Sequence, residues 1–172
     1  VSRVPDGFRL LNGKVVRAAE GLGISKFDAM LSWSQYHSIH LAAARIKSRY
    51  PRLPWVAHFS DPWVDNPFNE VKGLTFEINR RLERKVIETA DRILFTTPET
   101  VDLVMAKYPG TFRQKVRVIP HGFEPSLYTG AQPSPLTSRP AVFRYLGNFY
   151  GMRTPRPLYR ADRKSTRLNS SH

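Results

Sequence analysis

The hydrophobic residues of this chain form short continuous runs that alternate with longer stretches of helical spacing. Each run has the length of a buried strand, and the four runs are 29–33, 55–59, 92–96 and 116–119. After the first run, Ile39, Ala42 and Ile46 recur at helical spacing. Because strands alternate with helices, the pattern predicts an α/β fold with a parallel sheet and crossover helices.

The longest helical stretch follows the second predicted strand. Apolar residues lie one turn apart there, with basic residues between them: Leu74, Ile78, Leu82 and Val86 alternate with Arg80, Arg81, Arg84 and Lys85. We expect the apolar stripe to cover the sheet. The basic residues predict either a solvated helix face or a peripheral contact with anionic lipid. Nucleic acid is disfavoured because no aromatic residues are interleaved with them.

Two further helices have recognisable end signals. Thr97 offers a capping hydroxyl and Pro98 suits the first helical position, so a helix is predicted to run to about residue 107. Nearer the start of the chain, the spacing of Val15, Val16 and Ala19 indicates one helix that Gly21 and Gly23 end.

The composition changes after residue 124. Residues 125–140 contain four prolines and few apolar side chains, as an interdomain linker does. A new strand is predicted for 142–146. The pattern therefore divides the chain into a first domain, 1–124, the linker, and the start of a second domain, 141–161.

The last eleven residues, 162–172, have no hydrophobic period. Their sequence, DRKSTRLNSSH, resembles the in-frame translation of a common sequencing-adapter oligonucleotide, and every codon matches. We interpret this tail as adapter-derived, with a natural polar tail as the alternative. We also expect both ends of the chain to be cuts in a longer protein.

Charge and composition narrow the classes of function. The chain has 27 Lys+Arg against 14 Asp+Glu, a net charge of +13, and +11 remains without the tail. Such a field attracts phosphates, anionic lipid or nucleic acid. The lack of cysteine excludes disulfides and thiolate zinc sites, and no apolar run has the length of a membrane span. We expect a cytoplasmic protein, with peripheral contact at the inner membrane face as an addition.

Four segments carry motifs that occur together in one enzyme family, namely 55–67, 81–97, 118–124 and 144–155. Over residues 28–157 the chain resembles glycosyltransferase family four. The sequence VIPHGFE at 118–124 is similar to the I-P-N-G-V-D ending of that family's first domain, with His for Asn and Glu for Asp.

The resemblance implies a retaining enzyme of the GT-B architecture, which needs no cofactor. In that architecture two Rossmann-like domains face each other across a cleft. The first binds the acceptor, a glycan or a lipid-linked molecule, and the second binds the nucleotide-sugar donor. Residues 1–124 are then an incomplete Rossmann-like acceptor domain, and the isolated chain is expected to be inactive.

The loop after the second predicted strand is the candidate acceptor site, because ligands of open parallel sheets bind beyond the carboxyl ends of strands. Asp61 is placed to orient or deprotonate an acceptor hydroxyl, Trp63 offers a flat face to a sugar ring, and Asn66 both donates and accepts. Ser60 and His121 complete the predicted acceptor-binding set. The alternative is a rigid proline turn, with Trp63 in the core and the polar side chains bonded to backbone amides.

A glycine-containing segment follows the last predicted strand. Glycines at 147 and 151 allow backbone N–H groups to approach a phosphate, and Arg153 adds a charge-assisted contact to a diphosphate. The family resemblance implies that Gly147, Asn148, Gly151 and Arg153 bind the donor. An ordinary strand-to-helix turn is the alternative.

Three histidines remain outside this scheme. His37 and His40 lie one helical turn apart, but without an acidic third ligand nearby we expect surface or capping roles and no metal site. His58, inside a strand, is interpreted as a hydrogen-bonded core group rather than a base.

Two other functions stay open. A nucleotide-sugar epimerase shares the GT-B architecture, and a non-enzymatic basic binding module would explain the charge. The loop at Asp61 and the glycine-containing segment favour a transferase over the binding module. These two features do not discriminate well between a transferase and an epimerase.

Overall fold

The computed structural model describes residues 4–68, 71–130, 144–149 and 153–169. The chain divides into two compact units, 1–123 and 124–172.

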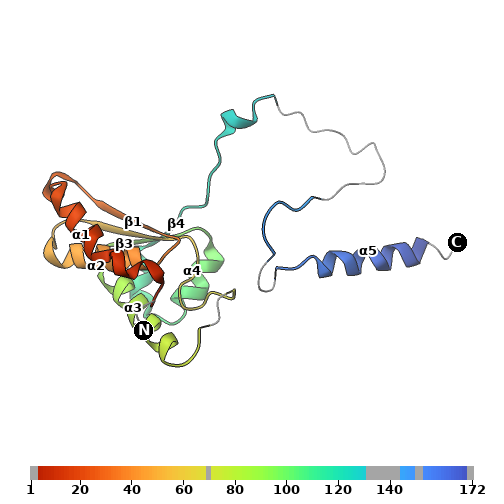
Figure 1. Ribbon diagram of the computed structural model, residues 1–172, viewed down its shortest axis with the longest axis horizontal. Coiled ribbons are helices and arrows are strands. Elements are labelled where there is room, and N and C mark those ends of the chain that lie inside the picture. Colours follow the sequence, from red (N-terminus) through yellow and green to blue (C-terminus); the bar gives the residue numbers. More distant parts are fainter. Residues whose placement is uncertain (1–3, 69–70, 131–143, 150–152, 170–172) are drawn as a thin grey trace. The chain divides into compact units, whose positions relative to one another are not determined.

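The first unit contains a parallel four-stranded sheet in which every strand pairs with its neighbour in sequence (Figure 1). The strands are β1 (Met30–Ser34), β2 (Trp55–Phe59), β3 (Arg92–Phe95) and β4 (Val116–Val118). The register aligns Met30 with Trp55 and Ile93 with Val116. This confirms the predicted α/β, Rossmann-like fold, and each strand lies within one residue of its predicted bounds.

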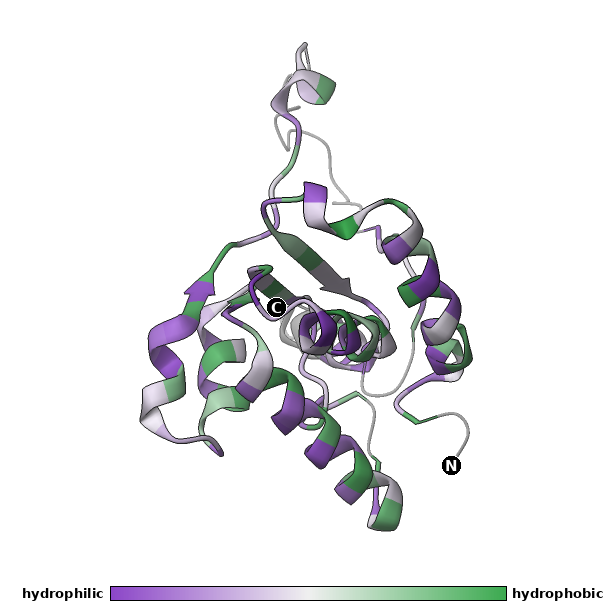
Figure 2. Ribbon diagram, turned by 90° about the vertical axis from the view of Figure 1, so that its left-hand side faces the viewer, coloured by the Kyte–Doolittle hydropathy of each residue, from purple (hydrophilic) through white to green (hydrophobic). Residues whose placement is uncertain are grey.

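The described residues of this unit form four α-helices: α1 (Asn12–Gly21), α2 (Ser38–Arg49), α3 (Gly73–Thr89) and α4 (Pro98–Met105). Short 3-10 turns occur at η1 (Gly7–Leu11), η2 (Ile24–Lys26) and η3 (Gly110–Lys115). Figure 2 shows hydrophilic and hydrophobic segments alternating along the helices, the pattern of one buried and one solvated face.

The helix ends follow from local chemistry. The Thr97 hydroxyl accepts a hydrogen bond from the Thr100 N–H at 3.2 Å, which confirms the predicted cap of α4. Helix α4 ends at Met105, two residues before the predicted end. After α1 the chain turns at Gly23, whose φ of 76° is a left-handed conformation that favours glycine.

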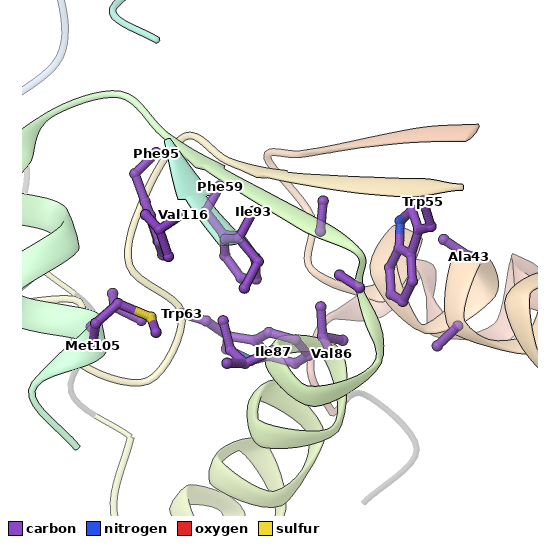
Figure 3. Close-up of a cluster of buried hydrophobic side chains, with 14 of the residues drawn as sticks. Ala43, Trp55, Phe59, Trp63, Val86, Ile87, Ile93, Phe95, Met105 and Val116 are labelled. Atoms are coloured by element: carbon purple, nitrogen blue, oxygen red, sulfur yellow. The ribbon is translucent and has the colours of Figure 1, made fainter. Parts of the chain in front are cut away.

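The main core lies on one side of the sheet, between the strands and α2, α3 and α4 (Figure 3). Phe59 and Ile93 project from the strands toward Val86 and Ile87 of α3, and Trp55 lies beside Ala43 of α2. The five larger side chains are fully buried, and each burial contributes about 1.5–3 kcal/mol. Helix α1 packs on α2 rather than on the strands.

The prediction that the apolar stripe of α3 is buried against the sheet is only partly correct. Val86 is buried, but Leu74, at the other end of the predicted stripe, is 72% exposed. Two polar residues, Asn79 and Glu83, take the buried positions on this helix instead. The reason is that both side chains form buried hydrogen bonds to the loop after β2.

The second unit contains a 3-10 turn at η4 (Pro125–Tyr128) and helix α5 (Arg156–Asn169). Most of the predicted linker, 131–140, lies outside the described residues. The strand predicted for 142–146 is not found in its described part, 144–146, which is irregular. A strand needs a hydrogen-bonded neighbour, and the described residues of this unit offer none.

Helix α5 extends into the eleven-residue tail to which no element was assigned. Its side chains from Arg156 to Arg163 are all exposed. A helix of this length without packing is marginally stable in water. Of the helices described in either unit, none is both long enough and apolar enough to cross a lipid bilayer.

Candidate functional site

The loop that follows β2 is anchored by the two buried polar side chains of α3. The Trp63 indole N–H donates to Asn79 Oδ1 at 2.8 Å, and the Val64 backbone N–H donates to Glu83 Oε2 at 2.9 Å. Both contacts are buried, so water does not compete for them. The direction in which the loop leaves the strand is therefore set by α3.

Glu83 has no solvent exposure, and a buried carboxylate needs several partners to offset its desolvation. Its Oε1 accepts from the Tyr108 hydroxyl at 2.6 Å and pairs with Lys107 Nζ at 2.7 Å. Lys107 also forms an ion pair with Asp65 of the loop. Burial and the Glu83 charge raise the pKa of Tyr108, which keeps its hydroxyl protonated and donating.

Asp61, Trp63 and Asn66 line one cleft of about 270 Å³ beyond the carboxyl ends of β1 and β2. Its other walls include Gln35, Tyr36 and His37, which follow β1, and Asp6 from the start of the chain. The structure thus brings together three of the five predicted acceptor-binding and catalytic residues.

The polar residues of the loop differ in what they offer the cleft. Asp61 is exposed, and its carboxylate accepts no hydrogen bond from any residue that the structure describes. Asn66 Oδ1 accepts from the Phe68 N–H at 2.9 Å, so this residue offers its amide NH2 group. The alternative of a proline turn, in which the polar side chains bond to backbone amides, therefore describes Asn66 but not Asp61.

The expectation that Trp63 presents an open face to a sugar ring is wrong. The side chain is 6% exposed and belongs to the core. One face of its indole stacks on His37, with ring centroids 4.7 Å apart and planes at 3°. Anchored by Asn79 as well, Trp63 shapes the wall of the cleft from within.

His37 is held neutral at the cleft wall. Burial lowers its pKa to about 4, although the nearby Asp6 carboxylate acts in the opposite direction. Its Nδ1 is buried and has no hydrogen-bond partner among the described residues. His37 is therefore a neutral, partly unsatisfied group beside Asp61 rather than a cation.

His40 belongs to the core rather than to the cleft. The Trp55 indole donates to Ser32 Oγ at 2.8 Å, which leaves the Ser32 hydroxyl proton for His40 Nδ1, also at 2.8 Å. Burial lowers the pKa of His40 far below its usual value. No group of three potential ligands within the described parts of the chain is arranged to hold a metal ion.

Ser60 and His121 lie in a second group, apart from the cleft. The Trp33 indole donates to Ser60 Oγ at 3.0 Å, and its ring packs on His58 with centroids 4.3 Å apart. The His121 ring lies 6.4 Å from that of His58. Trp33 and His58 pair in register and alternate with Ser32 and Phe59, so they occupy the sheet face opposite the helices.

His58 has a lowered pKa, caused first by burial and then by the charge of His121. Its Nδ1 is buried without a hydrogen-bond partner among the described residues. The residue is buried, but it lies on the sheet face opposite the helices rather than in the main core, and no hydrogen bond at this nitrogen is found among the described residues.

The candidate donor segment is described only in part. Gly147 has a φ of 149°, and an added Cβ would lie 3.2 Å from the Tyr145 hydroxyl oxygen. That hydroxyl donates to the Asn148 carbonyl at 3.2 Å and closes a local turn. Gly151 lies outside the described residues, and Arg153 is exposed.

Sequence reasoning missed several residues of the cleft. Asp6, Gln35 and Tyr36 line it and were assigned no role there. The signal for Tyr36 was available, because this residue directly follows the first strand and the same rule that selected Asp61 applies to it. No comparable signal exists for Asp6, which reaches the cleft only through tertiary structure.

The fold and the cleft define a Rossmann-like domain that binds its ligand beyond the carboxyl ends of parallel strands. The family model of the glycosyl transferase 4-like domain matches residues 3–122, and the chain belongs to this family. Compared with curated proteins, the chain has no match at a significant level. Family membership makes it a transferase domain that acts on sugar-containing substrates.

Proposed function

We propose that this domain forms the acceptor side of a glycosyltransferase, which moves a sugar from a nucleotide-sugar to a hydroxyl group of a glycan or a lipid-linked acceptor. The observation that carries the proposal is the exposed Asp61 carboxylate, which lines the cleft and accepts no hydrogen bond from the described residues. Such a carboxylate is able to accept a hydrogen bond from an acceptor hydroxyl and to take its proton during attack.

The donor is assigned to the segment with Gly147, Asn148, Gly151 and Arg153. Backbone N–H groups and a guanidinium would bind the diphosphate there. Retention of configuration follows from the family resemblance alone. Holding donor and acceptor together contributes about 7–11 kcal/mol to catalysis and needs both walls of the site, so we expect no turnover from these 172 residues by themselves.

The decisive test uses a protein that joins this domain to a complete donor-binding domain. Asp61→Asn should lower kcat/KM for the acceptor by about 100-fold or more, the usual contribution of a general base, and leave the Kd of the nucleotide-sugar unchanged. Arg153→Ala should weaken donor binding instead. Asp28→Asn, an exposed aspartate at the other end of the sheet, is the matched control.

Two outcomes would contradict the proposal. Wild-type acceptor kinetics in Asp61→Asn would remove Asp61 from the reaction. Release of an epimerised nucleotide-sugar without a glycosylated product would favour the epimerase.

Peripheral contact with anionic lipid is a second part of the proposal, and α3 gives it limited support. Arg80 pairs with Glu77 at 3.0 Å and Arg84 pairs with Glu88 at 2.7 Å on the exposed face of the helix. These carboxylates neutralise part of the predicted basic stripe. Binding to vesicles that contain phosphatidylserine should therefore be weak and should vanish in high salt.

A further inference from the structure

The cleft at Asp61 lacks the positive charge that dominates the rest of the molecule. The whole chain carries a net charge of +13, yet no lysine or arginine occurs among the described residues that line this cleft. The charged side chains that line it are Asp6 and Asp61, and Gln35 and Asn66 add amides. An anionic ligand would meet two carboxylates there without a cation to offset them.

The nearest anion-binding position is already occupied by the protein itself. A helix N-terminus attracts anions through its free N–H groups, and α2 begins beside the cleft. The Asp6 carboxylate takes this position, with Oδ2 accepting from the Ser38 N–H and Oδ1 from the Phe8 N–H, both at 2.9 Å. The Asp6 carboxylate therefore offsets the positive end of the helix, and its own charge opposes the binding of a second anion there.

His37 supplies no compensating cation either. Its ring is held against Trp63 and is neutral at physiological pH because burial lowers its pKa to about 4. A neutral imidazole donates or accepts a hydrogen bond, which suits a hydroxyl group.

An exposed aromatic ring stands at the same cleft. Tyr36 is 49% exposed and lines the cleft, and the Phe8 ring packs against its ring with centroids 4.3 Å apart and planes tilted by 45°. A rigid, exposed ring beside hydroxyl-binding groups is suited to the apolar C–H face of a pyranose. Tyr36 thus offers the open aromatic face that the buried Trp63 does not.

We infer that the cleft binds an uncharged sugar ring of the acceptor, stacked on Tyr36 with its hydroxyl groups at Asp61 and Asn66, and that it rejects phosphorylated or carboxylated sugars. This inference rests on the proposed function and specifies its acceptor. If the acceptor is lipid-linked, the inference requires that its phosphate groups lie outside the cleft.

The test measures binding of simple sugars to the full chain by saturation-transfer difference NMR. The neutral probes are the methyl glycosides of glucose, galactose, mannose and N-acetylglucosamine, and the charged probes are glucose 6-phosphate and glucuronic acid. At least one neutral glycoside should receive saturation, and the charged sugars should bind at least about 5-fold more weakly at low salt, the effect of about 1 kcal/mol of repulsion.

Substitutions of Tyr36 test whether the sugar stacks on this ring. Tyr36→Ala should weaken binding of the neutral glycoside by about 5-fold or more, whereas Tyr36→Phe should retain it because stacking uses the ring. Tyr159→Ala, an exposed tyrosine of α5, is the matched control. Asp6→Asn removes the charge and keeps one acceptor oxygen, enough for the Ser38 N–H but not for the Phe8 N–H as well. In a variant that is folded by circular dichroism, it should narrow the affinity difference between neutral and charged probes.

Three outcomes would overturn the inference: no signal from any neutral glycoside, equal binding in Tyr36→Ala that is folded by circular dichroism, or charged sugars that bind as tightly as neutral ones. The measurement needs no donor. The sugar-binding inference can therefore be contradicted while sugar transfer is observed, and it can be supported while transfer is absent.

Discussion

At the scale of single residues, Glu83 helps to shape the candidate site although it is not among the residues that line the cleft. Its carboxylate joins the loop backbone at Val64 to Lys107 and Tyr108 beyond α4. Removing one member of such a buried network leaves the other members desolvated and unpaired. That loss exceeds the net contribution of the intact network.

Glu83→Ala should therefore lower the free energy of unfolding by about 3–5 kcal/mol. Glu88→Ala removes a carboxylate of the same helix whose ion pair with Arg84 is solvent-exposed, and it should change stability by less than about 1 kcal/mol. Urea unfolding followed by circular dichroism measures both. Equal losses in the two variants would show that the buried network contributes no more than a surface pair.

The burial of His37 and His40 predicts that the folded state loses stability in acid. The pKa of His37 is lowered to about 4 and that of His40 is also lowered, mainly because burial disfavours the charged ring. Between pH 4 and about 6.5 the unfolded chain therefore binds more protons than the folded one, so stability is complete above pH 6.5 and falls as the pH decreases.

Each such histidine contributes up to about 1.4 kcal/mol per pH unit within this range. Thermal melts at pH 7.5 and pH 5 should show a clear decrease in Tm at the lower pH. In His37→Gln that decrease should be smaller, because one of the titrating rings is gone. A Tm that stays constant between the two pH values would contradict the burial of these rings.

At the scale of elements, the strands could be predicted to within one residue because each is a short run rich in apolar residues, although only β2 is buried along most of its length and β1 alternates between buried and exposed side chains. The buried face of α3 could not be predicted, since Asn79 and Glu83 are polar and only their tertiary hydrogen bonds explain their burial. The burial of Trp63 could not be predicted either, because the sequence does not distinguish a tryptophan with an open face from one that is buried behind the cleft wall.

Helix α2 receives its cap from outside its own sequence, and this explains why the cap could not be predicted. Asp6 lies 32 residues before Ser38, whose N–H donates to its carboxylate. Asp6→Ala should lower stability by about 1–2 kcal/mol, within the range for a lost helix cap. Asp102→Ala, which removes a side chain that is 72% exposed and pairs with Arg113, should have a smaller effect in the same urea titration. If both variants unfold at the same urea concentration, Asp6 does not stabilise α2.

At the scale of the whole first unit, one face of the sheet carries exposed apolar side chains. Leu31 is 57% exposed and Trp33 is 58% exposed, and both belong to β1 at the edge of the sheet. An exposed apolar edge strand is a surface on which chains associate. The described helices cover only the opposite face.

Leu31→Lys should therefore slow aggregation, because a charge on an edge strand opposes pairing with another chain. Leu74→Lys is the matched control, since Leu74 is even more exposed but lies on α3. Static light scattering at 37 °C compares the two variants with the wild type. Equal protection by both would mean that added charge, rather than the strand, controls association.

The order of the strands has a further consequence for how the chain acquires its structure during synthesis. Each strand pairs with the one made just before it, so a nascent chain meets its partner strand as soon as the intervening helix has left the ribosome. Among the four described strands, none has to wait for a distant segment. The sheet is thus able to grow vectorially, one β-α unit at a time, with β4 as the last strand to dock.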